Sequence, residues 1–370
     1  MKFEQFQLER NQSLWEGKVD YNLSESGVHP GTIKSLFDAE LIEKIENTEI
    51  TYGFTEGSIE LRNAIASIYT GATKNNIQVF NGSAEANMVA ILTLMEPGDE
   101  MVYMVPNYLQ IYGFARGLGV NVTTFALKES LGWKPDLDEL KSMVTEKTKM
   151  ISICNPNNPT GAVLSKDMVH EIGKIAQEVD AWILVDEVYR GAELNRKECT
   201  SFWDIDYDKT IVNCGLSKAY GLPGLRIGWS ISNPDYIQKS WATNDYTSLS
   251  VGRLSDVIAS HVLHPDNRMK TLDHIRDSLT ENLNIFQKWV DSHSDHFSFI
   301  PPAAGAMAFI GYDWEINSTE LFEKVRKEAS VLLVAGDWYG MDRYLRFGYG
   351  ASRSHLMPAL DRVTSIFQSL

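Results

Sequence analysis

The fold is decided by residues 210–229, which read TIVNCGLSKAYGLPGLRIGW. The first five of them, Thr210–Cys214, form a short apolar run that is typical of a buried strand. A turn rich in glycine and small residues follows, and it carries Lys218. A lysine is normally a solvated surface charge, but this position favours a nucleophile held at the end of a strand. Its amine can form a Schiff base with an aldehyde, and it can act as a base once it is desolvated.

Similar strands recur along the chain and alternate with amphipathic helices. The other strands of this type are expected at Ile77–Asn81, Glu100–Val105, Asn121–Phe125, Met150–Cys154 and Trp182–Val185. The helices between them are expected at Glu85–Leu94, Tyr108–Leu118, Leu137–Val144, Lys166–Glu178 and Pro234–Trp241. This alternation indicates crossover units and an α/β fold with a mostly parallel sheet. Such sheets bind ligands outside the carboxyl ends of their strands.

The pattern changes from about Pro265 onward. One long helix is expected near residues 267–291, and a second near 318–328. Short strands are expected near Phe297–Ile300, Ala306–Ile310, Val331–Val334 and Tyr344–Phe347, before a closing helix. We therefore expect an N-terminal arm (1–35) that packs on a smaller α+β lobe (265–370), and a large domain (36–264) between them.

Composition excludes several classes of protein. The chain has 370 residues, 44% of them hydrophobic, and a formal net charge of −15. This charge argues against non-specific binding to nucleic acids or anionic membranes, because both need a basic face, but it leaves room for a local basic pocket that binds an anionic ligand. Its 3 cysteines match no metal-binding spacing and are expected to be buried, reduced thiols. With neither a signal-peptide core nor a run of ~18 apolar residues, we expect a cytoplasmic protein without a metal site.

Two further motifs follow buried strands. Asp186 comes directly after Trp182–Val185. It is either a turn or cap residue, or a carboxylate that pairs with a protonated pyridine nitrogen and so makes that ring an electron sink. Tyr189 can lie near the same ring. Residues 155–161, Asn-Pro-Asn-Asn-Pro-Thr-Gly, form either a plain turn or a rigid loop whose amide donates to a phenolate oxygen.

Four positions suit anionic or aromatic ligands. Residues 81–86, Asn-Gly-Ser-Ala-Glu-Ala, open a helix after a strand and so present N–H groups to an anion. Arg226 can hold a phosphate by a bidentate contact. Tyr108 either stacks on a flat ring or packs in the core. Arg346 lies between apolar neighbours and needs an anion, which is either a structural partner or a substrate carboxylate.

Three motifs, in their order and spacing, resemble the class I/II aminotransferases. They are Asn-Pro-Asn-Asn-Pro-Thr-Gly, Asp-Glu-Val-Tyr, and Ser-Lys followed by Gly-Leu-Pro-Gly-Leu-Arg. These are fold-type I enzymes that depend on pyridoxal 5'-phosphate (PLP). The resemblance runs from about Tyr21 to the C-terminus. It implies a large, mostly parallel seven-stranded-type sheet sandwiched by helices, with a smaller C-terminal α+β lobe. It also implies transfer of an amino group between an L-amino acid and a 2-oxo acid, in a homodimer with shared active sites.

The resemblance implies a role for each site residue. Lys218 forms the Schiff base and moves the proton, and Asp186 pairs with the pyridine nitrogen. Asn158 and Tyr189 contact the phenolic oxygen, and Tyr108 stacks on the ring. Ser83, Ala84 and Arg226 hold the phosphate, while Tyr52 reaches the phosphate of the neighbouring subunit. Arg346 binds the substrate carboxylate, with Asn158 and the Gly27 backbone beside it. Gly215 departs from the Ser or Thr of many relatives, so one phosphate contact is missing or is replaced by Ser217.

Two alternatives stay open. Similar scaffolds catalyse β- or γ-elimination, or a cyclisation like that of capreomycidine synthase-type members, which residues 23–29 and 245–251 resemble locally. The other alternative is a non-catalytic PLP-binding protein, although Lys218 and Asp186 are both present. The substrate side-chain pocket is expected near Val28, His29 and residues 247–253, and the sequence does not identify the amino donor.

Overall fold

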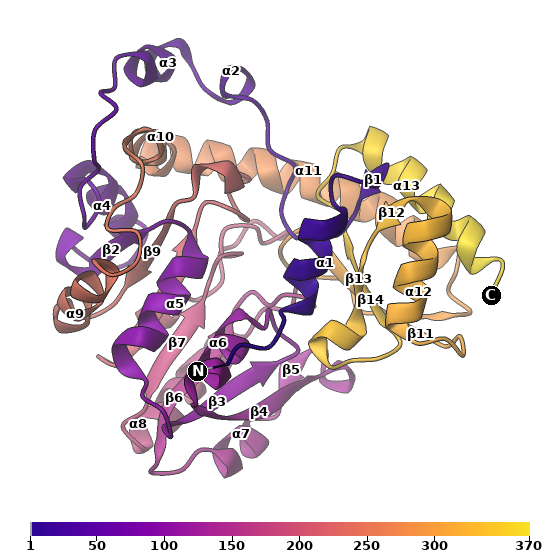
Figure 1. Cartoon of the computed structure of the whole chain (residues 1–370), viewed down its shortest axis with the longest axis horizontal. Coiled ribbons are helices and arrows are strands. Elements are labelled where there is room, and N and C mark those ends of the chain that lie inside the picture. The colour runs from indigo at the N-terminus through magenta and orange to yellow at the C-terminus, as the bar shows by residue number, and fades with distance from the viewer. Residues whose placement is uncertain (1) are drawn as a thin grey trace.

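An eight-stranded sheet forms the centre of the larger part of the molecule in the computed structural model, which describes residues 2–370 (Figure 1). Its order is β2 (Ile77–Phe80), β9 (Gly228–Ile231), β8 (Thr210–Gly215), β7 (Trp182–Asp186), β6 (Thr148–Cys154), β3 (Glu100–Val105), β4 (Asn121–Lys128) and β5 (Lys134–Pro135). The inner strands from β8 to β4 pair in parallel, whereas β9 is antiparallel to both of its neighbours. The mostly parallel sheet is therefore confirmed.

Two strands of this sheet were not expected from the sequence. The two-residue β5 pairs antiparallel with β4 and adds an edge strand to the seven that the resemblance implied. The four-residue β9 follows the glycine-rich turn after Lys218 and returns antiparallel beside β8. It has the sequence Gly-Trp-Ser-Ile, which is too short and too mixed to show a clear strand period.

Both faces of the sheet are covered. On β3, Val102 and Met104 join one apolar cluster, while Met101 and Tyr103 join another. Side chains of a strand point alternately to its two faces, so helices must pack on both of them. The helices of this part are α2 (Ile33–Leu36), α3 (Ala39–Glu46), α4 (Ile59–Ala66), α5 (Ser83–Leu94), α6 (Gln110–Leu118), α7 (Leu137–Met143), α8 (Lys166–Glu178), α9 (Pro234–Asn244) and α10 (Arg253–Leu263).

The C-terminal part contains a four-stranded antiparallel sheet. Its order is β10 (Phe297–Phe299), β11 (Met307–Tyr312), β14 (Tyr344–Gly348) and β13 (Val334–Ala335). Its helices are α11 (Pro265–Asp291), α12 (Ser318–Lys324) and α13 (Arg353–Phe367). The strand expected at Val331–Val334 is divided, because β12 (Val331–Leu332) pairs with the N-terminal arm and β13 pairs with β14. The helix expected to end at Glu328 continues from α12 as a π-helical turn.

The N-terminal arm contacts both parts of the molecule. Its strand β1 (Tyr21–Asn22) pairs in parallel with β12. Its helix α1 (Gln7–Trp15) lies between the two sheets in Figure 1. Phe3 stacks on Phe114 of α6, and the Trp15 ring lies 3.7 Å beneath the guanidinium of Arg326. The arm is therefore placed where it can cover a site between the sheets, while the boundaries 1–35, 36–264 and 265–370 stay a prediction.

Two expectations from composition can be compared with the structure. Cys154, Cys199 and Cys214 are buried and unpaired thiols, as expected. Within residues 2–370, no helix combines the length and the apolar character that a bilayer span requires.

Candidate active site

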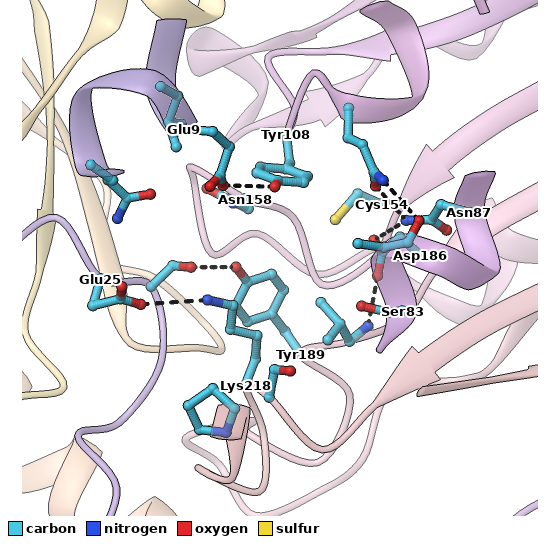
Figure 2. A pocket seen from close by; sticks show the side chains of 18 of the residues that line it. Glu9, Glu25, Ser83, Asn87, Tyr108, Cys154, Asn158, Asp186, Tyr189 and Lys218 are labelled. Atoms are coloured by element: carbon cyan, nitrogen blue, oxygen red, sulfur yellow. Dashed lines mark hydrogen bonds and ion pairs between the residues drawn. The ribbon is translucent and has the colours of Figure 1, made fainter. Parts of the chain in front are cut away.

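One pocket gathers most of the residues that the sequence singled out (Figure 2). It is lined by Ser83, Ala84, Tyr108, Asn158, Asp186, Tyr189, Ser217, Lys218, Arg226 and Arg346. Gly27 lies just behind this lining, since a Cβ added to it would be 3.3 Å from Cδ of Lys218. Tyr52 lies elsewhere, 84% exposed at a shallow depression beside residues 248–252. A single chain therefore brings together every predicted site residue except Tyr52.

Lys218 projects into the pocket from the turn after β8. The backbone N–H of Ala219 donates to the carbonyl of Val188 over 3.3 Å, which ties this turn to the loop after β7. The amine of Lys218 lies 3.7 Å from Oε2 of Glu25. Figure 2 places Lys218 and Tyr108 on opposite sides of the cavity. An amine and an aromatic face thus enclose a space where a flat ring can lie.

Asp186 is the last residue of β7 and is buried. Its Oδ1 accepts from the backbone N–H of Val188 over 3.0 Å, and its Oδ2 accepts from Nδ2 of Asn87 over 3.0 Å. Burial raises the pKa of Asp186, while these two hydrogen bonds and the charge of Lys218 act to lower it. A buried carboxylate of this kind is well suited to pair with a protonated ring nitrogen.

The start of α5 forms a cradle for an anion. Gly82 precedes the helix with a φ of 91°, and a Cβ there would collide with the guanidinium of Arg226. Nη1 of Arg226 donates to Oγ of Ser217 over 3.4 Å. A helix N-terminus, a hydroxyl and a guanidinium therefore surround one spot beside Ser83, which fits the phosphate of PLP.

The backbone packing explains the departure at Gly215. A Cβ at this position would lie 2.9 Å from the carbonyl oxygen of Ile227, and 3.6 Å from Cβ of Ser83. Real Cβ atoms essentially never approach a backbone oxygen so closely. A serine or threonine therefore does not fit here without moving the backbone at Ile227, and Ser217 supplies a hydroxyl that accepts from Arg226.

Arg346 lies on β14 at the other end of the pocket and is 1% exposed. Its Nη1 donates to Oδ1 of Asn158 over 2.9 Å and to the hydroxyl of Tyr339 over 2.6 Å, and its Nη2 donates to the carbonyl of Ser24. Its buried Nε has no partner. Burial raises the pKa of Tyr339 to about 12, against the lowering effect of the Arg346 charge. A buried guanidinium with a free N–H suits a carboxylate ligand.

The sequence interpretation missed several residues of the pocket. They are Leu8, Glu9, Gln12 and Ser13 from α1 and Glu16 directly after it, Glu25 and Ser26 after β1, and Asn87, Gln110, Cys154, Val188 and Pro223 from the larger part. The hydroxyl of Tyr108 donates to Oε1 of Glu9 over 2.7 Å, and that of Tyr189 donates to Oγ of Ser26 over 2.8 Å. The sequence could have indicated Asn87, since it lies one helical turn after the predicted site residue Ser83. The arm residues had none.

The basic and the acidic side chains of the pocket come from different parts of the chain. The basic side chains are Lys218, Arg226 and Arg346, and each has a predicted ligand group. Apart from Asp186, the acidic side chains are Glu9, Glu16 and Glu25, all from the arm. Across residues 2–370, no group of three or more His, Cys, Asp or Glu side chains is arranged to hold a metal ion. The arm therefore makes its side of the pocket acidic.

Comparison with known proteins agrees with this geometry. Residues 21–363 match the family model of aminotransferase class I and II. A PLP-dependent aminotransferase from Streptococcus suis 89-1591 superposes with a TM-score of 0.94 at 32% identity, covering 100% of this chain and 99% of that one. Capreomycidine synthase from Streptomyces vinaceus is 27% identical over 357 residues, which are 95% of this chain and 90% of that protein. Aspartate aminotransferase from Thermotoga maritima is 26% identical over 343 residues, 89% of this chain and 87% of that one. The chain therefore belongs to the class I and II aminotransferases, PLP-dependent enzymes of fold type I.

Proposed function

We propose that this enzyme transfers an amino group between an L-amino acid and a 2-oxo acid, with Lys218 as the residue that binds PLP covalently and moves the proton. The observation that carries this proposal is the convergence of Lys218, Asp186 and Arg346 on one pocket. They supply an amine from the turn after β8, a buried carboxylate from the end of β7 and a buried guanidinium from the middle of β14. Transamination needs these three functions at the aldehyde, at the ring nitrogen and at the substrate carboxylate.

PLP supplies an aldehyde that captures amino groups, and a ring that withdraws electrons from them. Asp186 would keep positive charge at the ring nitrogen. Tyr108 would cover one face of the ring. The phosphate would be held by Ser83, Ala84, Ser217 and Arg226. Because Oδ1 of Asn158 already accepts from Arg346, its amide nitrogen remains to donate to the phenolic oxygen, together with the hydroxyl of Tyr189.

Arg346 would fix the substrate by its α-carboxylate, with Asn158 and the Gly27 backbone beside it. This anchor sets which Cα bond stands perpendicular to the cofactor ring. Lys218 would then remove the Cα proton and return it on the cofactor side of the nitrogen. The second half of the reaction, on a 2-oxo acid, uses the same groups in reverse.

A second copy of the chain is proposed to complete the site. Large apolar side chains are exposed in two stretches of the chain, residues 33–59 and residues 246–254 at and before the start of α10. They are Ile33, Leu36, Ile50, Tyr52, Phe54, Ile59, Tyr246, Leu249 and Leu254. In Figure 1, α2 and α3 stand away from the body of the molecule. Apolar patches of this kind mark protein interfaces. In a homodimer, Tyr52 would reach the phosphate of the neighbouring subunit.

The compartment and the domain division are also proposals. Three buried free thiols suit a reducing compartment, which supports the cytoplasm. The start of α11 at Pro265 supports a boundary between residues 36–264 and 265–370. The pairing of β1 with β12 supports an arm over residues 1–35 that packs on the smaller lobe.

A PLP-dependent cyclase or lyase is the second candidate. The likeness to capreomycidine synthase extends over 95% of this chain. A PLP-dependent cyclase, OrfR, shares the fold with a TM-score of 0.90 at 21% identity. The residues proposed for transamination would serve these reactions as well, since they also begin with proton removal from Cα.

One experiment separates these candidates. The enzyme is saturated with PLP, and the visible band of the lysine-bound cofactor is followed while single L-amino acids are added without any 2-oxo acid. Bleaching to a stable pyridoxamine spectrum that a 2-oxo acid reverses supports transamination. Spontaneous recovery of the band with release of ammonia supports a lyase, and recovery with a cyclised product supports a cyclase. A wild-type protein that gives no such band, or a Lys218→Ala variant that keeps it, would contradict the proposal.

A further inference from the structure

Asp186 is held by a line of buried side chains that the proposed cofactor contacts do not include. Oγ of Ser230 donates to Oδ1 of Asn213 over 2.5 Å. Nδ2 of Asn213 donates to Oδ1 of Asn87 over 2.8 Å, and Nδ2 of Asn87 donates to Oδ2 of Asp186 over 3.0 Å. Ser230 and Asn213 are 0% exposed and Asn87 is 2% exposed. Elements β9, β8, α5 and β7 thus contribute one residue each to this line.

The order of donors fixes which way the Asn87 amide faces. Because Oδ1 of Asn213 accepts from Ser230, the NH₂ group of Asn213 is turned toward Asn87. The carbonyl oxygen of Asn87 accepts that bond, so its NH₂ group is turned toward Asp186. A flipped Asn87 would place its oxygen against a carboxylate and its NH₂ group against another NH₂ group, which leaves buried polar atoms unpaired.

We propose that Asn87 is a positioning residue that keeps Asp186 ionised and directed at the ring nitrogen of PLP, an inference that rests on the proposed function. A carboxylate is favoured in its charged form by donors to its oxygens and disfavoured by burial. Asn87 supplies the side-chain donor that opposes burial at this site. The line through Asn213 and Ser230 keeps that donor in place.

The other titratable groups near Asp186 cannot take over this role. They are Lys218, Cys154, Cys214, Tyr103 and Tyr108. Burial raises the pKa of both thiols and both phenols above their ordinary values, so these four groups are neutral near neutral pH. Lys218 is the one basic group among them, and in the proposed function its amine is taken up by the covalent bond to the cofactor. Asn87 and the Val188 N–H then remain as the groups that favour the ionised form.

The test compares Asn87→Leu with the wild type as holoenzymes. Leucine has a similar volume and no donor. We expect PLP to bind about tenfold more weakly or worse, and kcat to fall about 10- to 100-fold, the range for a lost hydrogen bond to a charged group. KM for the amino donor should change little, because Arg346 is untouched. The pH titration of the visible band of bound PLP should shift, a readout that a merely structural role would not move.

Two further variants make the test decisive. Ser230→Ala removes only the far donor, and it should change the same quantities in the same direction by a smaller factor. This variant decides the question if Asn87→Leu does not fold. Asn282→Ala is the control, because Nδ2 of Asn282 donates to the carbonyls of Tyr349 and Ala351, away from the pocket. It should lower thermal stability and leave the band titration unchanged.

The outcomes are distinguishable. If Asn87→Leu folds and keeps the wild-type affinity for PLP, band titration and kcat, Asn87 does not position Asp186. The same conclusion follows if Asn282→Ala shifts the band titration as much as Asn87→Leu does. If the wild type itself gives no visible band with PLP, the proposed function fails, and this inference fails with it.

Discussion

Nη1 of Arg346 donates a 2.9 Å hydrogen bond to Oδ1 of Asn158, which lies 188 residues earlier in the chain. The bond joins β14 of the smaller sheet to the loop after β6 of the larger one. Nε of the same guanidinium is buried without a partner. A buried cation with an unused donor is costly unless a ligand pairs with it. The two parts of the chain therefore meet at a position prepared for a carboxylate.

Replacing Arg346 with lysine should impair substrate binding more than turnover. A lysine keeps the charge but not the planar fork that a carboxylate accepts in two places. We expect kcat/KM for amino donors to fall about 10- to 100-fold, mainly through a higher KM. Steady-state kinetics on the holoenzyme measure both constants. Arg343→Lys is the control, since Arg343 is exposed and pairs with Glu315 at the surface. An unchanged KM in Arg346→Lys would exclude the carboxylate role.

The acidic side chains of the arm should select against acidic amino donors. Glu16 and Glu25 line the pocket but lie outside the predicted cofactor contacts. We expect a higher kcat/KM for donors with a cationic side chain, such as ornithine or lysine, than for aspartate or glutamate. Replacing either glutamate with glutamine should narrow this ratio by about two- to fivefold, the range for partly exposed charges. Glu46→Gln on α3 should not change the ratio. A wild type that prefers aspartate would contradict this prediction.

Restoring the serine of many relatives at position 215 should weaken cofactor binding. Gly215→Ser places a Cβ 2.9 Å from the carbonyl oxygen of Ile227 and close to Ser83. Overpacking of this kind moves the backbone that forms the proposed phosphate site. We expect the PLP dissociation constant to rise roughly tenfold, as measured by fluorescence titration. Gly224→Ala is the matched control, because a Cβ there meets no atom within 4 Å. Tighter PLP binding by Gly215→Ser would show that the missing hydroxyl matters more than the packing.

Three site residues that the sequence predicted lie at or just after strand ends. Lys218, Asp186 and Asn158 each follow a buried apolar strand, and parallel strands bring such positions to one edge of a sheet. This is why local motifs were sufficient to group them. Glu9 and Tyr339 had no comparable signal. Glu9 reaches the pocket only because the arm returns across it, and Tyr339 lies in a short 3₁₀ turn. Both depend on packing between distant segments.

The same distinction applies to the fold. The strand expected at Glu100–Val105 has those bounds in the structure, because apolar residues run through it and polar loops flank it. The strand β9 was missed, since its four residues follow a glycine-rich turn and carry no period of their own. Asn87 is an intermediate case. Its place one turn after Ser83 is visible in the sequence, but its bond to Asp186 depends on the packing of α5, which connects β2 to β3, against β7.

A charge in the exposed apolar surface should disrupt the proposed dimer. Ile50 is 83% exposed, so Ile50→Glu should not affect the folding of a single chain. Burying the new carboxylate between two subunits would be costly. We expect analytical ultracentrifugation to show a shift from dimer toward monomer, with weaker PLP binding because Tyr52 is no longer supplied. Met357→Glu, at a 40% exposed apolar residue of α13, is the control. A wild-type monomer with full activity would exclude shared active sites.

Glu187, directly after the proposed cofactor carboxylate, should make stability depend on pH. It is 0% exposed, Ser201 and the backbone N–H of Phe202 donate to it, and Arg190 lies 3.9 Å away. Burial raises the pKa of Glu187 from 4.5 to about 7, against the lowering effect of the Arg190 charge and of these hydrogen bonds. The folded chain therefore holds a proton that the unfolded chain releases. The resulting stabilisation is complete below the unfolded value of 4.5 and is lost as pH rises through about 7.

Glu187→Gln should remove this dependence. The free energy of unfolding of the wild type, relative to that of the variant, should fall by about 3 kcal/mol between about pH 5 and about pH 8. Urea denaturation at both pH values measures it. Glu198 provides a control of opposite sign. Burial raises the pKa of Glu198, but Arg268 and Arg190 lower it by more, so its net pKa is below the ordinary value. Its contribution to the free energy of unfolding is present above that ordinary value and is lost only as pH falls below it. Glu198→Gln should therefore lower stability at both pH values without adding a pH dependence between them. Parallel curves for wild type and Glu187→Gln would show that Glu187 is ionised in the fold throughout.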